Sequence, residues 1–167
     1  MPPPVVIDGL AFVRSGSQLD GKLDAQAMPR LAAMGWQLRH AGFTVTGVTD
    51  GRGKPALRLR ASAGLETVCQ RCLGTLTLEL SVDEVLELSH SPQEIAQAED
   101  NVDRVLASPA MNVAEMVEDE LILALPYTPK HEGCTMAGAA QAGVQVAATE
   151  RSSPFEALER LKPRGGP

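Results

Sequence analysis

The sequence predicts an α+β domain built from an antiparallel β-sheet or a partly closed barrel, one main packing helix and a short C-terminal helix. Three observations support this fold class. Residues 36–85 alternate apolar and polar side chains in segments separated by short turns, which is typical of an antiparallel meander. Residues 112–125 instead follow a helical pattern behind a capping residue. At 167 residues, the chain is long enough to bury a core without disulfides.

We expect the chain to be organised in three parts around one core. Residues 1–35 are expected to form an N-terminal extension with a short helix. Residues 36–134 are expected to form the α+β core domain, including a mobile excursion at 89–111. Residues 135–167 then supply a flexible linker and an amphipathic C-terminal helix.

In the N-terminal part, residues 14–34 are expected to be a loop that leads into a short helix. Asp24 is the candidate N-cap of this helix and Gly35 its stop. The apolar patch at 5–7 is interrupted by Asp8, and no basic segment precedes it. We therefore expect neither a secretory signal nor a transmembrane span, and a cytoplasmic location.

The sheet is expected to arise from consecutive alternating segments. Residues 35–48 predict one long strand, or a strand with a glycine bulge, and a turn follows at 50–53. Residues 56–61 and 66–72 predict two further strands. Residues 75–82 give the clearest strand of the chain. Short turns between such strands favour antiparallel pairing.

The main helix is expected to begin behind Asn112, whose side chain can accept from the first free amides. Glu115 can reach back in a capping-box arrangement, and residues 116–125 continue the helical pattern. Pro126 ends the helix, and acidic side chains in its early turns oppose the positive end of the helix dipole.

Two other segments are expected to lie outside this framework. Residues 89–111 are polar and acidic with two prolines, which predicts a surface excursion with one helical turn at 92–99. Residues 135–150 are small and alanine-rich and predict disorder, whereas 153–162 predict a short amphipathic helix. Its apolar positions are Phe155, Leu158 and Leu161.

The three cysteines of the chain give a metal-site hypothesis. Cys69 and Cys72 form a CxxC pair, and His131 and Cys134 form a second pair about sixty residues later. Two closely spaced pairs of soft or borderline ligands suit a structural zinc ion. Two alternatives stay open. In the first, Cys69 and Cys72 are partly buried strand residues that behave as small apolar side chains, and His131 and Cys134 cap a surface loop. In the second, the CxxC pair exchanges disulfides, although no helix start lowers its thiol pKa values.

Charge and motifs restrict the function. The net charge of −6 argues against a wholly basic surface. A local cluster nevertheless includes Arg58 and Arg60, which would share one face of a strand with Arg52 and Lys54 nearby; the alternative is an ordinary solvated strand face. The chain lacks a glycine-rich phosphate loop, a nucleophile elbow and a His-Glu-x-x-His motif. We therefore expect neither catalysis nor a small-molecule substrate.

Four blocks of sequence together resemble one protein family. They are Val68–Leu73, Met116–Pro126, Pro129–His131 with Cys134, and Ser153–Lys162, and their order is that of the bacterial YceD family. Members are described as large ribosomal RNA subunit accumulation proteins. The resemblance implies a role in synthesis, processing or stability of large-subunit (23S) ribosomal RNA, with no reaction attached.

The resemblance also implies partners. Plant relatives are described as binding the large-subunit ribosomal RNA, which implies RNA or a pre-ribosomal particle as partner. The RNA-binding candidates are then Arg39, Arg52, Lys54, Arg58, Arg60 and Arg71. The alternative is an acidic module that docks basic ribosomal proteins without RNA contact, through Glu115, Glu118, Asp119 and Glu120. These acidic residues are also the ones that would form a plain solvated helix face.

Overall fold

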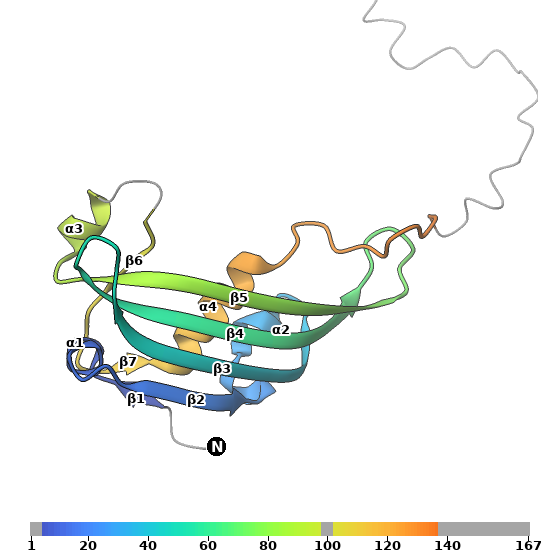
Figure 1. Ribbon diagram of the computed structural model, residues 1–167. Coiled ribbons are helices and arrows are strands. Elements are labelled where there is room, and N and C mark those ends of the chain that lie inside the picture. Colours follow the sequence, from blue (N-terminus) through green and yellow to red (C-terminus); the bar gives the residue numbers. More distant parts are fainter. Residues whose placement is uncertain (1–4, 98–101, 137–167) are drawn as a thin grey trace, which may run out of the picture. The chain divides into compact units, whose positions relative to one another are not determined.

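The computed structural model describes residues 5–97 and 102–136. Residues up to Cys134 belong to one compact unit. The fold of this unit is mixed α+β, with a five-stranded sheet in the order β2-β3-β4-β5-β6 and a two-stranded sheet of β1 and β7 (Figure 1). The α+β class is therefore confirmed. The predicted helix at 153–162 and most of the predicted linker at 135–150 lie outside the described residues.

The elements follow one another in a simple order. They are β1 (Val6–Ile7), α1 (Gly9–Arg14), β2 (Gln18–Leu23), the 3-10 helix η1 (Ala25–Ala27), α2 (Pro29–Ala33), β3 (Gln37–Thr49), β4 (Pro55–Val68), β5 (Thr75–Ser89), α3 (Pro92–Ala96), β6 (Arg104–Leu106), β7 (Met111–Asn112) and α4 (Val113–Ala124).

The predicted meander is formed by β3, β4 and β5, which pair antiparallel in sequence order. β4 is one continuous strand, whereas the sequence predicted two strands in this region. The small residues at its centre pair with the neighbouring strands and do not form a turn. The bulge in β3 lies between Leu38 and His40, so it is centred on Arg39 and not on a glycine. The predicted turn closes as expected: the Asp50 side chain accepts from the backbone N–H groups of Arg52 and Lys54.

Two parts of the sheet correct the expectations from sequence. Within the segment expected to be a loop, β2 pairs antiparallel with β3, from Gln18 opposite Thr46 to Leu23 opposite Ala41. The segment 89–111, which was expected to be an excursion, contains α3 where one helical turn was predicted. It also contains β6, which was not predicted and which pairs parallel with β5. Strands of three to six residues at a sheet edge carry too few buried positions for a clear alternation.

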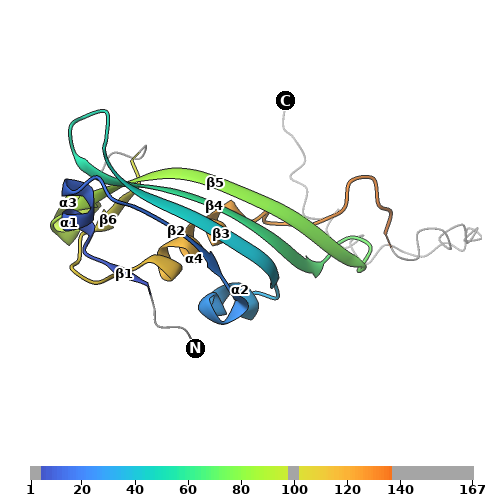
Figure 2. The same cartoon turned by 60° about the horizontal axis from the view of Figure 1, so that its bottom comes forward.

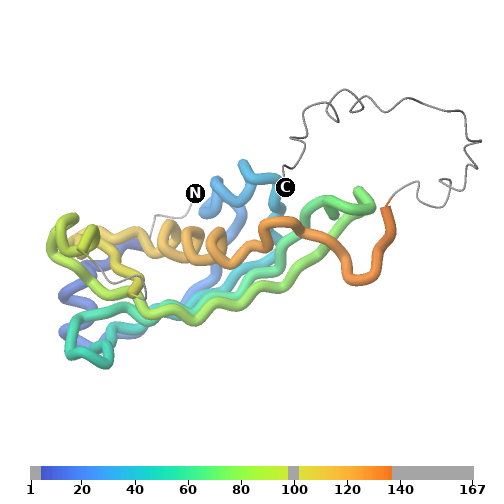
Figure 3. The backbone as a smooth tube through the Cα atoms, turned by 90° about the horizontal axis from the view of Figure 1, so that it is seen from above, coloured from blue at the N-terminus to red at the C-terminus, as the bar shows by residue number. Residues whose placement is uncertain are grey.

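The sheet of the described residues is open, so the barrel alternative is wrong. α2 and α4 lie on the same face of the sheet (Figure 2), and α4 contacts β4 and β5 (Figure 3). The core between these layers is fully buried and includes Leu57, Leu59 and Leu65 of β4 with Val117 and Leu121 of α4. We call the face of the sheet that packs against α2 and α4 the inner face, and the opposite face the outer face.

The start of α4 keeps half of the predicted capping arrangement. The Asn112 Oδ1 atom accepts from the backbone N–H of Ala114 at 3.1 Å. The Glu115 carboxylate accepts from the Asn112 side-chain amide at 2.9 Å, whereas a capping box would use the backbone N–H of the cap. None of the helices described here is long and apolar enough to cross a membrane.

Candidate functional site

The CxxC pair lies in the turn between β4 and β5. Cys69 follows the last residue of β4, and its N–H donates to the Gly74 carbonyl at 2.8 Å. Its own carbonyl accepts from the N–H of Leu73 at 3.0 Å, which closes the turn around the two thiols. Leu73 has a φ of 62°, in the left-handed region that favours glycine. The sequence therefore folds Cys69 and Cys72 inward at the end of a long hairpin.

Because Leu73 is 70% exposed, its side chain contributes little packing to offset this backbone strain. We expect Leu73→Gly to be more stable than Leu73→Ala by about 1 kcal/mol, since both lose the leucine side chain and only glycine relieves the strain. Chemical denaturation of the two variants measures the difference. Equal stabilities would show that the turn holds no strain at this position.

The second pair, His131 and Cys134, lies beside the CxxC turn although it is about sixty residues away in the sequence. After α4 the chain runs to the turn, where the Gln70 N–H donates to the Pro129 carbonyl at 2.9 Å. His131 and Cys134 then face the CxxC: the Cys69 and Cys134 sulfurs are 3.7 Å apart, and the Cys72 sulfur is 3.3 Å from His131 Nδ1. All four ligand atoms lie within 4.8 Å of one another. The predicted meeting of the two pairs is confirmed.

These separations fit a tetrahedral ion. Zn–S bonds of about 2.3 Å and Zn–N bonds of about 2.0 Å set sulfur atoms about 3.8 Å apart and a sulfur about 3.5 Å from a nitrogen. The observed 3.7 Å and 3.3 Å match both. The three cysteines are free thiols in the structure. The cluster could therefore bind a metal ion, and its donor set of three sulfurs and one imidazole is the kind that zinc prefers.

Hydrogen bonds from neighbouring groups orient the four candidate ligands and lower the pKa of one thiol. His131 Nε2 donates to the Thr75 carbonyl at 2.8 Å, which fixes the proton on Nε2 and leaves Nδ1 to face the cluster. Arg71 Nε donates to the Cys134 sulfur at 3.0 Å, and Arg71 Nη2 donates to the His131 carbonyl at 2.8 Å. The backbone N–H of Cys72, and after it that of Arg71, lower the pKa of the Cys69 thiol to about 5 although burial opposes them. Thiolate is the form that binds metal.

Apart from Arg71, the basic candidates lie outside the cysteine cluster, and each is paired with an acceptor. Arg58 and Arg60 share Asp83: Arg58 donates from Nε and Nη2 at 2.7 and 2.8 Å, and Arg60 from Nε at 3.1 Å. Hydrogen bonding by Arg58, and less strongly by Arg60, lowers the pKa of Asp83 to about 2. Arg39 pairs with Glu66, and Arg71 belongs to the cysteine cluster described above.

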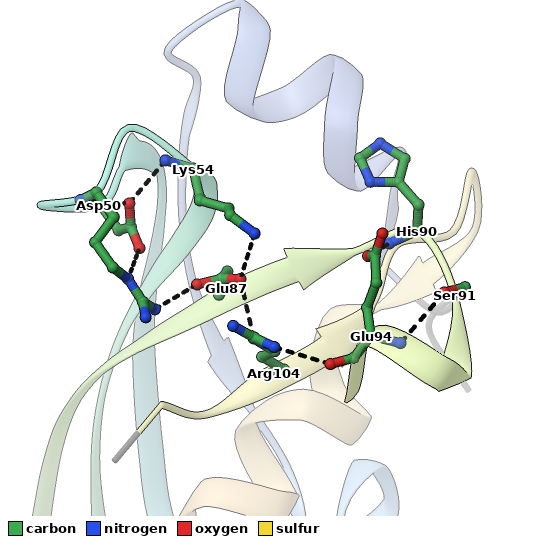
Figure 4. A network of polar contacts seen from close by, with 8 residues as sticks. Asp50, Lys54, Glu87, His90, Ser91, Glu94 and Arg104 are labelled. Atoms are coloured by element: carbon green, nitrogen blue, oxygen red, sulfur yellow. Dashed lines mark hydrogen bonds and ion pairs between the residues drawn. The ribbon is translucent and has the colours of Figure 1, made fainter. Parts of the chain in front are cut away.

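A second group of cations surrounds Glu87, whose side chain is only 3% exposed (Figure 4). Its oxygens lie 2.6 Å from Arg52 Nη2, 3.0 Å from Arg104 Nε and 3.5 Å from Lys54 Nζ. Sequence reasoning found Arg52 and Lys54 but missed Arg104 and Glu87. Arg104 reaches this place because β6 sets it opposite Glu87, a parallel pairing that no local pattern announces.

Both groups occupy the outer face. In the β4–β5 ladder Arg60 lies opposite Asp83 and Ala56 lies opposite Glu87, and directly paired residues share a face. We name Arg52, Lys54, Arg58, Arg60 and Arg104 the outer-face patch. Among the described residues, its five cations pair with three carboxylates, those of Asp50, Asp83 and Glu87. The patch therefore carries surplus positive charge in a chain that is acidic as a whole.

The four acidic docking candidates do not form one surface. Glu118 is buried and accepts from the backbone N–H groups of Arg30 and Leu31 at 2.7 and 3.0 Å, so it caps α2 from the neighbouring helix. Arg30 pairs with both Glu118 and Asp119. Asp119, Glu115 and the Glu118 carboxylate line a cavity of about 570 Å³ beside α2. Glu120 instead faces the β5 side, where other carboxylates lie close to it.

The family described as "Large ribosomal RNA subunit accumulation protein YceD" matches residues 57–162, which is more than half of the chain. The match includes both pairs of the cysteine cluster and nearly all of β4, and it leaves out β2 and β3. No curated protein and no solved structure matches the chain.

Proposed function

Because this chain belongs to the YceD family of large ribosomal RNA subunit accumulation proteins, we propose that it is a non-enzymatic ribosome-biogenesis factor that binds large-subunit ribosomal RNA or a pre-ribosomal particle. The family description concerns the accumulation of this RNA and names no reaction. The proposed site of action is the cytoplasm, where ribosomes assemble.

The surplus charge of the outer-face patch is the observation that carries the RNA contact. The side chains of four members are between 44 and 57% exposed, so their donors can reach a phosphate; these are Arg52, Lys54, Arg58 and Arg60. Asp83 and Glu87 hold the guanidinium groups in fixed positions before any ligand arrives, which lowers the entropy cost of binding. A depression of about 320 Å³ beside Arg60, lined also by Ser62 and Ser81, adds hydroxyl groups that can meet a sugar or phosphate.

We expect the double variant Arg58→Glu and Arg60→Glu to bind transcribed large-subunit ribosomal RNA about 10- to 100-fold more weakly than the native protein. The slope of log affinity against log salt concentration should also decrease in magnitude by about one to two. Each phosphate contact contributes roughly 0.7–0.9 to this slope. Filter binding or fluorescence anisotropy at several salt concentrations measures both quantities.

The matched control changes the same cluster in the opposite direction. Asp83→Asn removes the carboxylate that Arg58 and Arg60 share, so RNA affinity should rise severalfold. Two variants with opposite effects cannot be explained by partial unfolding. If both leave RNA affinity unchanged, the outer-face patch is not the RNA site, and contact with the particle through ribosomal proteins becomes the better account.

For the cysteine cluster, we propose one structural zinc ion held by Cys69, Cys72, His131 and Cys134. The ion would join the β4–β5 turn to the segment that leaves α4, two parts of the chain about sixty residues apart. When bound, zinc supplies a cross-link and no chemistry. Arg71 offsets the excess negative charge of three thiolates around a divalent ion.

A further inference from the structure

The long strand β5 has one open side. β4 pairs with it from Thr75 to Glu87, whereas β6 pairs on the other side only at Glu87, Leu88 and Ser89. Among residues 5–97 and 102–136, no strand pairs with β5 along 76–86 on that side (Figure 1). The sheet therefore ends in a strand edge of more than ten residues, which is long for an exposed edge.

The register shows which backbone groups face this open edge. At one end the Thr75 carbonyl points outward to His131 Nε2, and at the other end the Glu87 N–H points outward to the Asp103 carbonyl. The β4–β5 ladder has no register shift between them, and backbone direction alternates along a strand. Every second residue from 77 to 85 must therefore present its N–H and C=O to the open side. They are Thr77, Glu79, Ser81, Asp83 and Val85.

Carboxylates flank both sides of this edge. On the outer face, Asp83 pairs with Arg58 and Arg60, and Glu79 lies 3.3 Å from His40, so these two carboxylates already have partners. On the inner side Glu84 lies near Glu120 of α4 and Asp103. Glu84, Asp103 and Glu120 have no ion pair within the part of the chain that the structure describes. Burial, followed by repulsion from Asp103 and Glu84, raises the pKa of Glu120.

We propose that the open edge of β5 binds an extended basic polypeptide segment, which adds to the sheet as a further strand. The alternating backbone groups of residues 77–85 would supply the hydrogen bonds, as in other cases of strand addition. Lysine or arginine side chains of the added strand would meet the inner carboxylates, Glu84 and Glu120, which have no cationic partner among residues 5–97 and 102–136. This inference does not depend on RNA binding, because it uses the edge of the sheet and not the outer-face patch.

The charges disfavour the other occupants of such an edge. A second copy of this chain pairing two-fold about Ser81 would place Asp83 opposite Glu79 of its partner, and like charges opposite one another destabilise a strand pair. A nucleic acid would be repelled by the inner carboxylates. A basic segment is the occupant that gains from both the backbone groups and the charges.

The test uses a fluorescent octapeptide of alternating lysine and threonine as the probe, with the matching glutamate–threonine peptide as its control. We expect the basic peptide to bind the full chain and the acidic peptide not to bind. Ser81→Pro should weaken binding of the basic peptide at least tenfold, because proline removes an N–H from the open edge and leaves the β4 ladder bonds intact. Glu84→Gln combined with Glu120→Gln should also weaken it, and should reduce its dependence on salt.

Backbone amide shifts in NMR spectra supply a readout that does not depend on the proline variant folding. Addition of the basic peptide should shift the amides of residues 77–85 and leave those of β2 unchanged, since β2 is the sheet's other edge. Absence of binding, equal binding of the acidic peptide, or amide shifts confined to α4 would overturn the proposal. Concentration-dependent dimerisation through the same amides would assign the edge to a second copy instead.

Discussion

Dialysis of the purified protein against a strong zinc chelator is expected to remove one zinc ion per chain and to unfold the end of the β4–β5 hairpin. The reason is geometric: the four ligand atoms lie within 4.8 Å of one another, and an ion bound by all four would cross-link two distant segments, so its removal would remove that cross-link. Otherwise the two segments are joined by hydrogen bonds near the surface, such as those from Gln70 N–H to the Pro129 carbonyl and from Arg71 to the His131 carbonyl. The midpoint of thermal unfolding should fall by roughly 10 °C or more.

Elemental analysis and thermal unfolding before and after dialysis measure the two effects, and added zinc should reverse them. Cys69→Ser should reproduce the loss of metal without a chelator. Gln70→Ala is the matched control, because it changes the same turn but no ligand atom and should keep its zinc. Protein purified without added metal that holds no zinc, and whose unfolding is indifferent to both zinc and chelator, would contradict the prediction.

The sequence predicted the parts of the fold whose buried positions are numerous. β3, β4, β5 and α4 each place several apolar residues on one face, so alternation or helical spacing is visible in the sequence alone. β2 and β6 were missed because each takes its place from a neighbouring strand and not from its own pattern. The strands predicted at 56–61 and 66–72 left a gap that holds Ser62, Ala63 and Gly64, yet these small residues continue β4 against its neighbours.

The candidate sites differ in the same way. The cysteine cluster could be predicted because the preferences of zinc restrict both residue type and spacing, and the fold had only to bring two short motifs together. The outer-face patch was predicted only in part, because Asp83 and Glu87 come from β5 and Arg104 comes from β6. A list of cations in a sequence does not show which carboxylate each one will meet. The free edge of β5 was not predicted at all, since an unpaired strand edge depends on which strands are absent beside it.

Glu118→Ala is expected to lower the free energy of unfolding by about 2–4 kcal/mol, although the residue was a candidate for docking partners. The Glu118 side chain is 1% exposed, and α2 has no side-chain cap of its own. Loss of the carboxylate would leave the backbone N–H groups of Arg30 and Leu31 without their acceptor, and would leave a cavity between α2 and α4. Each buried donor left unpaired costs about 1–3 kcal/mol.

Two further variants separate this capping role from the ion pair with Arg30. Glu118→Gln keeps an oxygen for the two N–H groups but loses the charge that faces Arg30, so it should cost about half as much as Glu118→Ala. Asp119→Ala removes the exposed partner of the same arginine and should cost less than about 1 kcal/mol. Urea denaturation of the three variants measures how much each one lowers the free energy of unfolding. If Asp119→Ala proved as costly as Glu118→Ala, the ion pairs and not the cap would hold α2 against α4, and Glu118 would again be free to serve a partner.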